Sequence, residues 1–78
     1  MDRATILEKV IEAVCENLEV DENDVNEETT FEDLDADSFD MLELVTALEE
    51  EFELTLDDEV LASIASIADA VDAIEAAL

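Results

Sequence analysis

One serine stands directly after an acid, at the start of an amphipathic stretch. Asp37 and Ser38 open the segment DSFDMLELV, in which apolar residues recur at helical spacing. A serine that acts as a nucleophile needs a nearby base, which is most often histidine, and the chain contains no histidine. We therefore expect that the protein is not an enzyme. Taken alone, an Asp-Ser pair predicts only an ordinary helix start.

A second set of polar residues could bind a cation. Asp21, Asn23 and Glu32 fall at positions 1, 3 and 12 of an EF-hand loop. The match fails at Val25, which occupies the fifth position, and at Asn26, which replaces the glycine of the sixth. The pattern favours weak divalent binding to carboxylates over a true calcium module, which stays an alternative of another class.

The charge of the chain is strongly one-sided. The chain has 26 acidic residues and only two basic ones, Arg3 and Lys9, which gives a formal net charge of −24. Such a charge repels nucleic acids and anionic membranes and attracts basic protein surfaces. We therefore expect protein partners with basic patches, and neither nucleic-acid binding nor membrane insertion. An acidic helical interaction protein without a prosthetic group remains a further alternative.

Composition favours one small helical domain over residues 1–78. Glycine and proline are absent, and 50% of the residues are hydrophobic, which is too many for a disordered chain. Cys15 is the only cysteine, so it forms no intramolecular disulfide, and we expect it to pack as a small hydrophobe. The chain lacks a long apolar run, and its N-terminus does not resemble a signal peptide. We expect a cytoplasmic monomer.

Apolar spacing predicts an all-α fold, a four-helix bundle of three longer helices and one short helix. The first helix should span residues 4–18, with either a Thr5–Glu8 capping box or Asp2 as its cap. A long loop follows over residues 19–37, with room for one helical turn, and it carries four separated apolar anchors: Val20, Val25, Phe31 and Leu34.

The second helix should begin at Ser38, with Asp37 as its cap, and end near Glu53. Its predicted core face consists of Met41, Leu44, Val45, Leu48 and Phe52. A short third helix, indicated by Val60, Leu61 and Ile64, should end before Ser66. The fourth helix should begin after a Ser66–Asp69 cap. Its predicted core face consists of Ile67, Val71, Ile74 and Leu78.

The segment DLDADSFDMLELVTALEEEFEL resembles the serine-containing segment of acyl carrier proteins. The likeness extends in order through nearly the whole chain. It implies that a transferase joins Ser38 to 4′-phosphopantetheine taken from coenzyme A, and that the thiol of this arm carries acyl groups as thioesters. A helix N-terminus suits such a phosphate, and Asp37 would support the serine. The freestanding length favours fatty acid biosynthesis, with a polyketide or other specialised pathway as the alternative.

Three residues depart from the family pattern. Asp35 replaces a glycine, Phe39 replaces the leucine that usually follows the serine, and Asp57 replaces a proline. Aspartate enters the left-handed region more readily than most residues, so Asp35 should preserve the turn. Phe39 should enlarge the contact surface beside the arm and affect the choice of partner.

The outward face of the second helix is a candidate partner-binding surface, because it combines apolar side chains with acids. The family also uses this helix to meet its enzymes. The candidate residues are Phe39, Leu42, Glu43, Glu49 and Glu50, with Glu53 nearby. Alternatively, the long loop could cover Phe39 or Leu42.

The resemblance also implies an acyl pocket between the second and third helices. The candidate lining residues are Val45, Leu48, Phe52, Ile64 and Ile67. An apolar stripe at this spacing is equally compatible with ordinary core, and both alternatives stay open.

Overall fold

Each helix begins at a side chain that satisfies a free backbone amide. In the computed structural model, which describes residues 2–78, Asp2 accepts a hydrogen bond of 2.9 Å from the backbone N–H of Thr5. Hydrogen bonding to the side chain of Thr5 and to its backbone N–H holds the pKa of Asp2 below its usual range. Asp2 is the cap of the first helix. Asp37, Asp57 and Ser66 cap the other three helices in the same way. Such caps typically contribute about 1 kcal/mol each.

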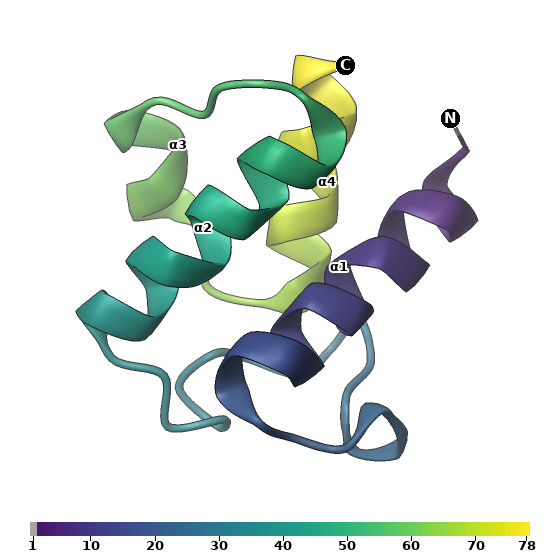
Figure 1. Ribbon diagram of the computed structural model, residues 1–78, viewed down its shortest axis with the longest axis vertical. Coiled ribbons are helices and arrows are strands. Elements are labelled where there is room, and N and C mark those ends of the chain that lie inside the picture. Colours follow the sequence, from purple (N-terminus) through teal and green to yellow (C-terminus); the bar gives the residue numbers. More distant parts are fainter. Residues whose placement is uncertain (1) are drawn as a thin grey trace.

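The predicted all-helical fold is confirmed, with three longer helices and one short one (Figure 1). A single 3₁₀ turn lies in the long loop, and one isolated bridge joins Thr30 to Ser66. The elements in chain order are α1 (Arg3–Leu18), η1 (Glu22–Asp24), α2 (Ser38–Phe52), α3 (Asp58–Ser63) and α4 (Ile67–Ala77). Within residues 2–78, no helix is both long and apolar enough to cross a membrane.

Three residues adopt the left-handed conformation that glycine usually supplies. Glu19 ends α1 with a φ of 54°, and Glu53 ends α2 with a φ of 53°. Asp35 has a φ of 58°, which confirms the prediction that it preserves the turn before Ser38. Because the chain has no glycine, residues with side chains adopt this left-handed conformation, which costs them free energy.

The core is mostly aliphatic and is centred on α1, which packs against α4 and α2 (Figure 1). Cys15 packs against this core, as expected, and burial raises the pKa of its thiol. Leu78 departs from the prediction, because it is 57% exposed. The buried cluster consists of Ile6, Val10, Val14, Val25, Phe31, Leu44, Leu48, Phe52, Ile67, Ala70, Val71 and Ile74.

The long loop is fixed to the start of α4. Its four predicted anchors all pack in or against the core. Backbone hydrogen bonds add to this attachment: Phe31 donates to the carbonyl of Ala65 at 3.0 Å, and Ile67 donates to that of Thr29 at 2.9 Å. The part of the loop that precedes Ser38 is therefore attached to the start of α4.

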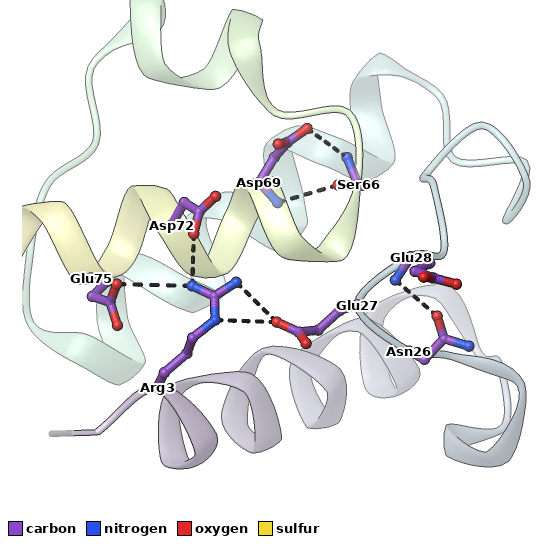
Figure 2. A network of polar contacts seen from close by, with 8 residues as sticks. All are labelled: Arg3, Asn26, Glu27, Glu28, Ser66, Asp69, Asp72 and Glu75. Atoms are coloured by element: carbon purple, nitrogen blue, oxygen red, sulfur yellow. Dashed lines mark hydrogen bonds and ion pairs between the residues drawn. The ribbon is translucent and has the colours of Figure 1, made fainter.

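The only two cationic residues of the chain both form ion pairs. Arg3 joins the long loop to α4, as Figure 2 shows: its guanidinium lies 2.9 Å from the carboxylate of Glu27, 2.6 Å from Asp72 and 3.8 Å from Glu75. Lys9 pairs with Glu51 of α2 at 2.9 Å. Hydrogen bonds to these carboxylates raise the pKa of both cations, so both stay charged at neutral pH.

Candidate functional site

Ser38 is the first residue of α2, and its side chain is exposed. Within residues 2–78, its hydroxyl has no hydrogen-bond partner. The backbone N–H groups of Ser38 and Phe39 also stay unpaired there, as expected for the first turn of a helix. The site therefore presents a free hydroxyl beside free amide donors, and such donors suit an attached phosphate.

The residues before Ser38 hold it in place. Asp37 Oδ1 accepts a hydrogen bond of 2.9 Å from the backbone N–H of Asp40, and Asp40 Oδ2 accepts one of 3.3 Å from that of Asp37. The N–H of Ala36 donates to the carbonyl of the buried Phe31 at 3.0 Å. Asp37, which was predicted to support the serine, thus forms a reciprocal cap with Asp40. This cap fixes the orientation of Ser38.

A groove of about 460 Å³ adjoins Ser38 and lies between α2 and α3. Its walls are mostly aliphatic, and Ser38 and Asp37 lie among its lining residues. The other lining residues are Ala36, Met41, Leu42, Val45, Asp58, Leu61, Ala62 and Ile64. An apolar chain attached near Ser38 could enter this groove without crossing the core.

Only part of the predicted acyl pocket lines this groove. Val45 and Ile64 do, as predicted. Leu48, Phe52 and Ile67 belong instead to the buried cluster around α1 and α4, because the side of α2 that bears Leu48 and Phe52 faces that cluster. In this structure the three residues are therefore core, the other of the two alternatives, and their role as pocket lining stays a prediction.

The face of α2 that includes Ser38 indicates the groove better than the predicted core face of α2 does. Ser38, Met41, Leu42 and Val45 lie at helix positions i, i+3, i+4 and i+7, so they share one side of α2. This side lines the groove, and α3 supplies the opposite wall through Leu61 and Ala62. Following the helix face that includes Ser38 would have identified the wall of α2.

The outward face of α2 is exposed as expected. Phe39 is 66% exposed and Leu42 is 59% exposed, so the alternative that the long loop covers them is wrong. Glu43 and Glu50 are also exposed. Two large apolar side chains therefore stand in an acidic surrounding beside Ser38.

Glu49 departs from this pattern. Its side chain is half-buried, and its Oε2 accepts a hydrogen bond of 2.8 Å from the backbone N–H of Leu56. The expectation that Glu49 stands exposed with the other acids is wrong, because this carboxylate turns toward the segment that follows α2.

The segment that resembled an EF-hand forms capped turns instead of a cation loop. Asp21 Oδ1 accepts a hydrogen bond of 2.9 Å from the backbone N–H of Asn23 and caps η1. In residues 2–78, no three side chains of His, Cys, Asp or Glu gather as a metal site would require. The structure gives the calcium hypothesis no support.

Comparisons with known proteins agree with this geometry. The family described as "Phosphopantetheine attachment site" matches residues 8–74. The chain is 45% identical to an acyl carrier protein of Rubrobacter xylanophilus over 73 residues, which cover 92% of this chain and 90% of that protein. It is 46% identical to an acyl carrier protein of Prochlorococcus marinus over 77 residues, which cover 97% and 96% of the two chains.

Solved structures give the same result. The acyl carrier protein of Thermotoga maritima matches with a TM-score of 0.84 and 34% identity, over 99% of this chain and 91% of the other. That of Enterococcus faecalis matches with a TM-score of 0.82 and 30% identity over the full length of both. With a phosphopantetheine family match over residues 8–74 and a shared helical fold, the chain belongs to the acyl carrier proteins.

Proposed function

We propose that Ser38 bears the 4′-phosphopantetheine arm of this acyl carrier protein. The observation that carries the proposal is the exposed hydroxyl of Ser38 at the start of α2, which has no partner within residues 2–78 and lies beside an apolar groove. As a family member, the chain has a covalently attached 4′-phosphopantetheine and carries acyl groups in fatty acid biosynthesis. When bound, the arm supplies a terminal thiol that forms the thioester with the acyl group.

The residues around Ser38 favour attachment in three ways. Asp37 and Asp40 hold the first turn of α2 through their reciprocal cap, so the hydroxyl is presented in one place. The free N–H groups of Ser38 and Phe39 and the positive end of the helix dipole favour a phosphate there. In the transfer, Ser38 Oγ forms a bond to the phosphorus that bears the pantetheine arm, the pyrophosphate P–O bond of coenzyme A breaks, and adenosine 3′,5′-bisphosphate leaves. We assign the base that takes the serine proton to the transferase, since this chain has no histidine.

We also propose that residues 1–78 act as one acyl carrier domain, a carrier and not a catalyst. The single buried cluster joins α1, α2, α4 and the long loop, which supports one domain. We place the protein in the cytoplasm as a monomer.

Acyl carrier proteins interact with synthases and acyl-processing enzymes, and the outward face of α2 is our proposed contact. This docking face consists of Phe39, Leu42, Glu43 and Glu50. Its acids would attract basic patches on the enzymes and speed encounter, while the two apolar side chains would hold the docked complex. Glu49 is left out because its carboxylate already accepts the amide of Leu56.

We propose further that the groove between α2 and α3 receives the acyl chain. Its aliphatic lining and its position beside Ser38 support this assignment. Val45 and Ile64 are retained from the predicted pocket, and Met41, Leu61 and Ala62 are added to it.

Intact-mass measurement after incubation with a phosphopantetheinyl transferase, coenzyme A and Mg²⁺ tests the site. One phosphopantetheine group should be added, and Ser38→Ala should abolish the addition. Ser63→Ala and Ser66→Ala should still be modified, although Ser66→Ala also removes the cap of α4. Modification of Ser38→Ala would disprove the assignment.

A further inference from the structure

We infer that Glu49 is a positioning residue: its carboxylate holds the segment between α2 and α3 and thereby places the α3 wall of the groove. The inference rests on the proposed function for its consequence, since the groove matters as the site of the acyl chain. Figure 1 shows how this segment leaves the end of α2 and returns to α3.

Glu49 accepts hydrogen bonds from several amides of the segment that follows it. Its Oε2 lies 2.8 Å from the backbone nitrogen of Leu56. Its backbone carbonyl accepts the N–H of Leu54 at 3.0 Å and also that of Glu53, the left-handed residue that ends α2. Only the bond to Leu56 depends on the side chain, so this is the bond that a substitution removes.

The position of α3 depends strongly on this segment. α3 has six residues, fewer than an isolated helix needs for stability in water. It also lacks the close packing that joins α1 to α4 and to α2. Its cap, Asp57, comes directly after Leu56, so fixing the amide of Leu56 fixes the start of α3.

Leu56 lies in a buried position on the groove side of the molecule. Leu56 is only 7% exposed, and the hydrogen bond from its backbone N–H to Glu49 is partly buried. Val45, which lines the groove, is 4% exposed, and both Val45 and Leu56 stand outside the main buried cluster. The groove side of the molecule thus depends on local contacts, and an unpaired amide at Leu56 would have to move toward water.

Two substitutions separate the hydrogen bond from the charge. Glu49→Met and Glu49→Gln both remove the carboxylate charge and both keep a long side chain, but only glutamine retains an oxygen that can accept the amide of Leu56. Glu50→Met is the matched control, because Glu50 is an exposed neighbour on the same helix that makes no side-chain hydrogen bond within residues 2–78.

Amide hydrogen exchange in the protein without the arm provides the first readout. In Glu49→Met, the amide of Leu56 should exchange at least about tenfold faster than in the wild type. The amides of α3 should also exchange faster. Glu49→Gln should restore most of the protection, and Glu50→Met should match the wild type. Exchange of Leu56 at the wild-type rate in Glu49→Met would overturn the inference, and this readout requires no modification of Ser38.

The second readout uses protein that carries an octanoyl thioester on the arm. In the wild type, the methyl NMR signals of Ala62 and Ile64 should shift between the free-thiol and octanoyl forms. We expect Glu49→Met to reduce these shifts at least about twofold and Glu49→Gln to restore them. Unchanged shifts in Glu49→Met would also overturn the inference. Failure of Ser38 to accept the arm would instead contradict the proposed function, and the exchange readout would still decide the role of Glu49.

Discussion

The boundary between α1 and α4 and the boundary between α2 and α3 are built from similar aliphatic residues, but only the second leaves a groove. Between α1 and α4, Ile6, Val10, Val71 and Ile74 have no exposed surface. Between α2 and α3, Leu61 and Ile64 are only half-buried, beside about 460 Å³ of open volume.

The difference follows from what holds each boundary together. α1 and α4 are long, and Arg3 connects them to the loop that is also bonded to the start of α4 (Figure 2). α3 is short, and its start is positioned by the segment after α2. One side of the molecule thus provides a fixed base, and the other leaves room for a ligand beside Ser38.

The largest expected effect comes from truncating a side chain at each of the two boundaries, the one between α1 and α4 and the one between α2 and α3. Ile74→Ala should lower the free energy of unfolding by about 3 kcal/mol, because it leaves a cavity among fully buried residues. Leu61→Ala should cost only about 1 kcal/mol, because Leu61 is half-buried beside open volume. Urea unfolding measures both, and equal losses would remove the distinction between the two boundaries.

The next effect concerns the docking face, which lies on the groove side of the molecule. Glu43→Lys should slow acyl transfer with a partner enzyme by about tenfold, equivalent to about 1.4 kcal/mol, and the loss should shrink at high salt. Phe39→Ala should weaken the docked complex with little salt dependence, because steering does not depend on its ring. Stopped-flow transfer rates at several salt concentrations measure both effects.

A matched charge reversal away from the docking face serves as the control. Glu8 on α1 is exposed and makes no side-chain hydrogen bond within residues 2–78. Asp72 would be unsuitable, because it pairs with Arg3. If Glu8→Lys slows transfer as much as Glu43→Lys, only the global charge matters and the docking face must be abandoned.

A smaller effect tests how α2 ends. Glu53→Gly should raise the free energy of unfolding by about 0.5 kcal/mol, because glycine occupies the left-handed region without a clash. Glu50→Gly should lower it by about 1 kcal/mol, because Glu50 lies inside the helix. Thermal and urea unfolding of the two variants should therefore change in opposite directions, and a loss in both would contradict the role assigned to the left-handed end.

The smallest effect should come from the ion pairs on the fixed side. Arg3→Met should lower the melting temperature more than Lys9→Met, because Arg3 joins three segments and Lys9 joins two. Melting temperatures of all variants should rise gradually with salt, since ions screen a net charge of −24. The deficit of Arg3→Met should shrink as salt increases. A saturating transition at micromolar Ca²⁺ would instead favour a specific cation site.

The sequence predicted the helix starts well because their cause is local. Asp37 and Ser66 were predicted as caps from their own chemistry and that of their neighbours in the chain, whereas the turn at Asp35 was predicted from the glycine that the family has there. The role of Glu49 and the lining of the groove could not be predicted in this way. Helical spacing shows which residues share a face, but it does not show whether that face meets α1, α3 or solvent, and the tertiary arrangement placed Leu48 and Phe52 in the core.

The most direct test of the account is amide hydrogen exchange of the wild-type protein with and without an octanoyl group on the arm. If the chain enters the groove beside Ser38, exchange should slow at least severalfold in α3 and at Ile64, while amides along the boundary of α1 and α4 keep their rates. Slower exchange confined to α1 and α4, or no change anywhere, would contradict the placement of the acyl chain between α2 and α3.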